Sequence, residues 1–200
     1  MLPISKLAFE PPGIAEIFTL PFSSLALDWF GKQLSPAPVF CLALSPESLY
    51  FAVEANRPAC CDPHPAGSFI EGLWQKDAAE FFLHEEGSSR YQEFNISPTG
   101  AWWTQLFSEK RVRDSKFKAP RNVRCLSQIS AGTWRAALAV PRRELAISLS
   151  WSSRSRINVC FMLGENEQRF LSWSKLPGTA PDFHQPSEFE NVLLKEITYD

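Results

Sequence analysis

The chain has 200 residues, of which 44% are hydrophobic and 21% are charged. That length is enough for one domain with a substantial core, and the composition is typical of a globular protein. The formal net charge of −2 provides no general attraction to nucleic acid or to an anionic membrane. These values predict a single domain over residues 1–200 and exclude binding that depends on a strongly basic chain.

The N-terminal residues lack the features of an export signal or a membrane anchor. Pro3, Lys6 and Glu10 interrupt the apolar stretch that a secretory signal peptide needs. We therefore expect a cytoplasmic protein, with secretion left open in case the sequence has been trimmed.

The first part of the chain has the pattern of short strands joined by turns, in keeping with 16 prolines, 16 phenylalanines and 7 tryptophans overall. Residues 39–44 are apolar, and the aromatic and β-branched content of 49–54 favours a hairpin between the two segments. Residues 22–33 are a candidate short helix. Residues 56–68 contain three prolines and two adjacent cysteines, which predicts a loop that leads to Trp74.

Residues 72–107 form the predicted centre of the chain, with three strand-like runs of which the first two lie at 77–83 and 91–96. Ser97-Pro98-Thr99-Gly100 has the pattern of a type I turn and therefore predicts a hairpin with the following strand. If Ile96 pairs with Ala101, Trp102 joins the polar face of this hairpin. Such a face suits a polar ligand with apolar ring faces, such as a sugar, although a solvated outer sheet face has the same pattern. Alternation along the first strand of the hairpin places Tyr91, Glu93 and Asn95 on the polar face and Gln92, Phe94 and Ile96 on the core face.

The second half of the chain begins with a basic stretch and continues with further strands. Residues 109–124 carry seven basic side chains but a single aromatic one, which favours a solvated hairpin extension over a nucleic-acid site. Residues 133–140 alternate as a half-buried strand does, and 142–151 are a candidate helix. Residues 157–163 and 169–173 predict a second hairpin.

The five cysteines are odd in number and lack the spacing of a disulfide framework. Cys60 and Cys61 are adjacent, and His64 follows them. Two adjacent thiols and one imidazole do not complete the four-ligand set of a structural zinc site. No metal is therefore predicted there.

Several segments, in order along the chain, carry a further signal. They are LWQKDAAEFFL at 73–83, RYQEFNISPTGAWW at 90–103, the Gly-x-Trp strand at 132–141, an Asn-containing strand at 157–161, a Trp-Ser segment at 170–174 and a Phe-His-x-Pro-x-x-Phe segment at 181–189. Together they resemble family 9 carbohydrate-binding modules and their DOMON-like relatives. The resemblance implies an all-β, antiparallel β-sandwich, immunoglobulin-reminiscent, with one or two short helices.

The same resemblance implies a ligand site. Two tryptophans of that family hold a terminal sugar between them, and Trp74 and Trp173 occupy the matching motifs, with Glu80 at the carboxylate position. Six strand residues span roughly 20 Å, so Trp74 must turn back from a loop to reach the same sugar as Glu80, and Gly72 makes that turn plausible. The further ligand-binding candidates are Arg90, Tyr91, Glu93 and Asn158.

Each further candidate also has a structural interpretation. Arg90 and Glu93 are equally typical of an exposed ion pair, and Asn158 of a side chain that buttresses a loop. His184 is more typical of a structural histidine that ties the C-terminal segment to the sheet than of a catalytic base.

We predict a non-catalytic, soluble carbohydrate-binding domain without a cofactor, with a structural Ca²⁺ and the oligomeric state left open. The sequence shows no pair of carboxylates set apart for glycoside hydrolysis, no catalytic triad and no glycine-rich phosphate loop. One alternative is an interaction or structural domain that has lost the sugar site. Another is a haem-binding DOMON-type domain, with Met162 and either His84 or His184 as axial ligands.

Overall fold

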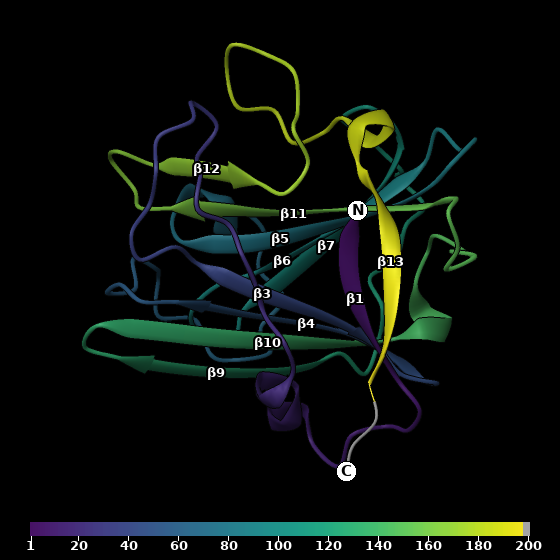
Figure 1. Ribbon diagram of the computed structural model, residues 1–200, viewed down its shortest axis with the longest axis horizontal. Helices are drawn as coiled ribbons and strands as arrows, with labels where there is room; N and C mark the ends of the chain where they lie inside the picture. The colour runs from purple at the N-terminus through teal and green to yellow at the C-terminus, as the bar shows by residue number, and fades with distance from the viewer. Residues whose placement is uncertain (198–200) are drawn as a thin grey trace.

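The structure is a computed structural model that describes residues 1–197, and its strands form two facing layers (Figure 1). Sheet 1 has the order β8-β7-β6-β5-β11, with β12 also paired to β11. Its strands are β5 (Ala78–Glu85), β6 (Tyr91–Ile96), β7 (Trp102–Glu109), β8 (Val112–Arg113), β11 (Ser155–Leu163) and β12 (Arg169–Ser172).

Sheet 2 has the order β1-β3-β4-β10-β9, with β2 paired to β3. Its strands are β1 (Leu2–Leu7), β2 (Ser23–Ser24), β3 (Val39–Leu44), β4 (Ser48–Ala55), β9 (Arg124–Ser130) and β10 (Thr133–Pro141). The short 3₁₀ segments are η1 (Ile14–Thr19), η2 (Leu73–Gln75), η3 (Arg142–Glu144) and η4 (Pro186–Glu188).

The last described strand, β13 (Glu190–Ile197), joins the two sheets. It pairs with β11 at Arg156 and Ile157, and it pairs in parallel with the whole of β1. Figure 1 shows β1 and β13 side by side, running across the direction of the other strands. The all-β sandwich prediction is confirmed, but β1 pairs in parallel with β13 and β3, so the strands are not all antiparallel.

The core lies between the two sheets because alternate residues of their strands are apolar. Phe51 of β4 and Phe81 of β5 meet across the sheets with ring centroids 4.9 Å apart, and Phe81 stacks on Phe94 of β6 at 4.8 Å. All three side chains are fully buried, which stabilises the fold by about 1.5–3 kcal/mol for each ring. The outer face of sheet 1 is therefore left to the residues that alternate with this core.

The β6–β7 hairpin has a register one residue different from the predicted one. Ile96 pairs with Trp102, not with Ala101, and Asn95 pairs with Trp103. Gly100 is left-handed, with φ 79°, and the Ser97 N–H donates to the Ala101 carbonyl after the type I turn. Such a turn followed by a left-handed residue adds one residue to the loop. Because side chains alternate, Trp102 enters the core and Trp103 takes the outer face.

Other local predictions have mixed outcomes. The β3–β4 and β11–β12 hairpins and the strand at 133–140 are confirmed. Residues 22–33 form no helix, and within 142–151 only Arg142–Glu144 is helical. No helix within residues 1–197 has the length and apolar character that crossing a membrane requires.

Gly100→Ala is expected to destabilise the protein by about 2 kcal/mol, measured by urea unfolding. An alanine at φ 79° is strained, and its Cβ would also lie 3.2 Å from both Ala66 and Ser127. Gly31→Ala is the matched control, because Gly31 has φ 78° with open space around it. Gly31→Ala should lower the free energy of unfolding by about 1 kcal/mol. If both variants lost the same stability, the packing around Gly100 would have no effect.

Candidate functional site

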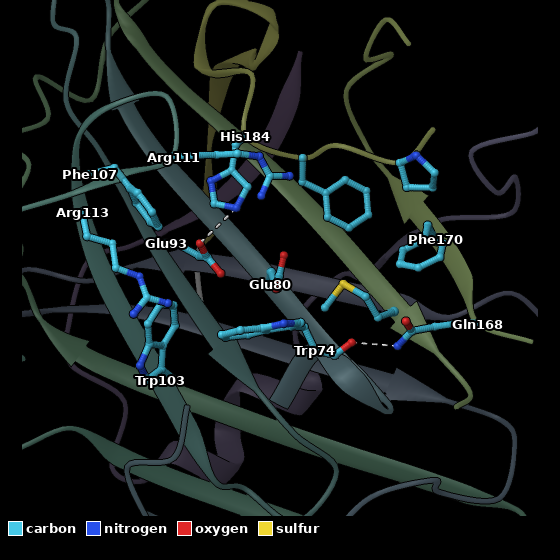
Figure 2. A pocket seen from close by; sticks show the side chains of 13 residues that line it. Trp74, Glu80, Glu93, Trp103, Phe107, Arg111, Arg113, Gln168, Phe170 and His184 are labelled. Carbon is cyan, nitrogen blue, oxygen red and sulfur yellow. Dashed lines mark hydrogen bonds and ion pairs between the residues drawn. The ribbon is translucent and has the colours of Figure 1, made fainter. Parts of the chain in front are cut away.

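A pocket of about 540 Å³ lies on the outer face of sheet 1 (Figure 2). Strand residues form its floor, while η2, the β7–β8 turn and the segment before η4 form its walls. The residues that line it are Trp74, Glu80, Glu93, Trp103, Phe107, Arg111, Arg113, Met162, Gln168, Phe170, Pro181, Phe183 and His184.

Trp74 reaches the pocket from a tight turn. Gly72 is left-handed, with φ 89°, and it begins η2, so the chain doubles back before β5. The Gln168 side-chain amide donates to the backbone carbonyls of Trp74 at 2.8 Å and Lys76 at 3.1 Å. The Trp74 ring meets Trp103 edge to face, with centroids 5.3 Å apart. The prediction that Trp74 turns back from a loop is confirmed.

A buried carboxylate, Asp77, anchors the segment between Trp74 and β5. Asp77 is fully buried and accepts hydrogen bonds from the backbone N–H groups of Cys60 at 3.1 Å and Gly164 at 2.6 Å. It thereby ties the loop that carries the adjacent cysteines to the β11–β12 turn. Within residues 1–197, no three His, Cys, Asp or Glu side chains gather as a metal site.

Two carboxyl groups touch at the floor of the pocket. Glu80 of β5 and Glu93 of β6 are diagonal neighbours on the outer face, only 4% and 3% exposed, and their carboxyls are in hydrogen-bonding contact. Burial and the neighbouring Glu93 charge raise the pKa of Glu80 well above its ordinary value. Burial also raises the pKa of Glu93 to about 7, although the Asn95 amide donates to it at 2.7 Å. Near neutral pH the pair therefore holds a shared proton.

His184 closes the site opposite Trp74 as a neutral ring (Figure 2). Burial, with the charge of Arg111, lowers the pKa of His184 to about 4. The Arg111 backbone N–H donates to the Tyr91 hydroxyl at 2.9 Å, and the same hydroxyl is hydrogen-bonded to His184 Nδ1, 2.8 Å away. Nε2 of the same ring faces Glu93 Oε2 at 3.7 Å.

The two arginines at the rim are already paired with carboxylates. Arg111 forms an ion pair with Asp182 at 2.8 Å, and Lys110 binds the other oxygen of the same carboxylate at 2.8 Å. Arg113 pairs with Glu71 at 2.5 Å, and its guanidinium lies over the Trp103 ring, 5.2 Å from the centroid. The rim thus offers N–H donors whose charges are largely neutralised.

Similar solved structures share this arrangement of strands, whereas no protein-family model and no curated protein matches the sequence. A candidate carbohydrate-binding protein of Bacteroides uniformis is 18% identical, with a TM-score of 0.72 over 97% of this chain and 99% of the other. A family 9 carbohydrate-binding module of Caldicellulosiruptor kristjanssonii in complex with cellotriose is 12% identical, with a TM-score of 0.63 over 98% and 95%. A family 9 module of the same organism in complex with glucose is 11% identical, with a TM-score of 0.64 over 98% of both chains. The chain has the family 9 fold.

Within this family 9 fold, the structure brings together three of the predicted site residues, Trp74, Glu80 and Glu93. Tyr91 lies behind them and reaches the pocket only through its hydrogen bond to His184. Arg90 is exposed, lies outside the pocket and pairs with Asp114 at 3.5 Å.

The predicted pairing of Trp74 with Trp173 is wrong. Trp173 is half-buried against the core between the sheets, where it meets Phe40 edge to face with centroids 5.4 Å apart. Asn158 is fully buried and holds the adjacent segment, because its side-chain oxygen accepts from the Ser174 N–H at 2.8 Å. Asn158 therefore supports the neighbouring loop, as its structural interpretation predicted, and it does not line the pocket.

The sequence patterns missed several pocket residues. Trp103 and Phe107 follow from alternation once the hairpin register is corrected by one residue. Arg111, His184 and Gln168 come from turns and loops, and no periodic pattern marks them. Only the Phe-His-x-Pro-x-x-Phe segment, which contains His184, carried a signal.

The pocket does not suit haem. Met162 and His184 both line it, but the two ring nitrogens of His184 face Tyr91 and Glu93. His84 lies outside the pocket, with its Nε2 bound to the Ser88 carbonyl at 2.8 Å. Two buried carboxyl groups at the floor would also oppose an apolar macrocycle.

Glu80→Gln is expected to raise the melting temperature at pH 8 and to have a smaller effect at pH 5. The folded pKa of Glu93, about 7, lies above its ordinary value of 4.5. The stability linked to the protonated pair is therefore full below pH 4.5 and is lost as pH rises through about 7. A glutamine removes the repulsion between two carboxylates at high pH. Thermal unfolding followed by circular dichroism across this range measures the difference.

Glu85→Gln, on the same strand as Glu80, is the matched control. Its effect on stability at high pH is expected to have the opposite sign. Burial works against ionisation of Glu85, but hydrogen bonds from Ser150 and Ser155 lower its pKa overall. This variant should therefore be less stable than wild type at pH 8. Parallel stability curves for wild type and Glu80→Gln would show that the two carboxyls do not interact.

Proposed function

We propose that this protein binds a carbohydrate, without catalysis, in the pocket on the outer face of sheet 1. One observation carries the proposal: the indole of Trp74 and the buried carboxyls of Glu80 and Glu93 line the same pocket. Figure 2 looks nearly along the plane of the indole, and both carboxyls lie on one side of it.

The chemistry of the lining matches that of a sugar ring. An aromatic face packs against the C–H bonds of the ring, while hydroxyl groups both donate and accept hydrogen bonds. The carboxyls of Glu80 and Glu93 accept at the floor, and the guanidiniums of Arg111 and Arg113 donate at the rim. The pocket therefore offers both an aromatic face and hydrogen-bonding groups, which a sugar ring can use together.

The fold supports the same proposal. Two of the structures with this fold are family 9 carbohydrate-binding modules in complex with cellotriose and with glucose. We infer that this chain also uses the family 9 fold to hold a sugar, with His184 and Arg111 opposite Trp74 in place of a second tryptophan.

The carboxyl geometry favours binding over glycoside hydrolysis. Hydrolases that act with two carboxyl groups keep them about 5 to 9.5 Å apart, so that a sugar carbon or a water fits between them. Glu80 and Glu93 are in hydrogen-bonding contact instead. No glycosidic bond fits between two groups that already touch.

Trp74→Ala is expected to weaken binding of glucose or cellotriose by about tenfold or more, equivalent to about 1.4 kcal/mol, because the ring loses its apolar platform. Isothermal titration calorimetry of the wild type and the variant with both sugars measures the change. Trp74 is half-buried at the pocket wall, so the variant should keep its circular dichroism spectrum.

Trp173→Phe is the matched control, because it keeps a ring against Phe40 and lies outside the pocket. Its affinity should equal that of the wild type. If Trp74 and Trp173 held the sugar between them, as the resemblance to family 9 modules implied, both variants would lose affinity. Absence of heat with every carbohydrate tried would favour an interaction or structural domain without a sugar site.

A further inference from the structure

The pocket floor holds two buried carboxyls whose charge the rim arginines Arg111 and Arg113 offset only in part. Within residues 1–197, Glu80 accepts no hydrogen bond from an amide, hydroxyl or cationic side chain and takes part in no ion pair. Glu93 accepts only from Asn95 and lies 3.7 Å from the neutral His184 ring. A buried carboxylate without a cation or sufficient donors is costly.

The charged groups around the pair are engaged elsewhere. Asp182 already binds both Lys110 and Arg111, and Glu71 binds Arg113. On the other sides of the pair, burial keeps the Cys160 thiol of β11 neutral by raising its pKa, and it raises the pKa of Tyr91 to about 12. The titratable and charged groups that face the pair come from four places: Cys160 from β11, Tyr91 from β6, Arg111 and Arg113 from the β7–β8 turn and β8, and His184 from the segment before η4.

A ligand ammonium group would supply what the floor lacks. It carries three N–H donors and one positive charge, whereas a neutral hydroxyl brings one donor and no charge. The face of Trp74 beside the carboxyls adds an attraction between the cation and the ring quadrupole. A carboxylate or sulfate on the ligand would instead be repelled by the same two groups.

We propose that the ligand is an amino sugar with a free amine, whose ammonium group binds both the Glu80 and the Glu93 carboxyl beside the Trp74 ring. This proposal rests on the proposed carbohydrate-binding function and specifies the class of sugar. Glu80 and Glu93 are then the residues that determine specificity, while Trp74 provides the general affinity for a ring.

The first test compares three matched sugars by calorimetry at pH 7 and 0.15 M salt. D-glucosamine should bind about tenfold or more tightly than D-glucose, and N-acetyl-D-glucosamine, which has no charge, should bind no better than glucose. Glucosamine binding should also release a proton from the carboxyl pair, so its heat should vary with the ionisation enthalpy of the buffer. Glucose heat should not vary in that way.

The second test uses variants. Glu80→Gln should bring the ratio of glucosamine to glucose affinity well below that of the wild type, because the ammonium then meets a single carboxylate that is shared with Asn95. Glu71→Gln is the matched control, since it removes a carboxylate near the rim that does not line the pocket. It should change the ratio by less than about twofold, because salt screens charges at this exposed part of the rim.

The outcomes separate this proposal from the proposed function. Equal affinity for glucose and glucosamine would overturn the amino-sugar proposal and leave carbohydrate binding intact, as would an unchanged ratio in Glu80→Gln. Binding of ethanolamine as tightly as glucosamine would overturn the sugar part, because the amine alone would then suffice. Absence of binding to all of these compounds would overturn both proposals.

Discussion

The register of the β6–β7 hairpin is the constraint on which the site depends. Side chains alternate between the two faces of a strand, so a shift of one residue exchanges the core face for the pocket face. The left-handed Gly100 adds one residue to the turn and places Trp103 and Phe107 beside Glu93, while Trp102 enters the core. A single backbone conformation therefore decides which aromatic rings surround the carboxyl pair.

Features encoded over a few residues could be predicted, and features made by distant contacts could not. The strands, the alternation of Glu93 with Phe94, and the turn that brings Trp74 back beside Glu80 follow from local patterns. The position of Trp173 does not, because a tryptophan that packs on Phe40 has the same local sequence as one that meets a ligand. The side of the pocket facing Trp74 comes from a loop near the C-terminal end, at His184, and no periodicity predicts it.

The carboxyl pair shows how the requirements of stability and of binding differ. Burying Glu80 and Glu93 in contact destabilises the folded protein at neutral pH, and apolar residues of similar size would pack there more favourably. Groups with strongly shifted pKa values in a pocket are characteristic of functional sites. The Tyr91 hydroxyl hydrogen-bonds both His184 and the Arg111 backbone, so these contacts next to the carboxyl pair are already made without a ligand.

The parallel pairing of β1 with β13 joins segments almost two hundred positions apart, from Leu2 paired with Val192 to Leu7 paired with Ile197. Contacts of such long range are slow to form because a large loop must close first. While the protein is being synthesised on the ribosome, β1 emerges well before β13 and must wait for this neighbour until the residues between the two strands have been translated. Until then its backbone N–H and C=O groups on that edge lack their partners, and the exposed edge is a site where chaperones, or a second nascent chain, can bind.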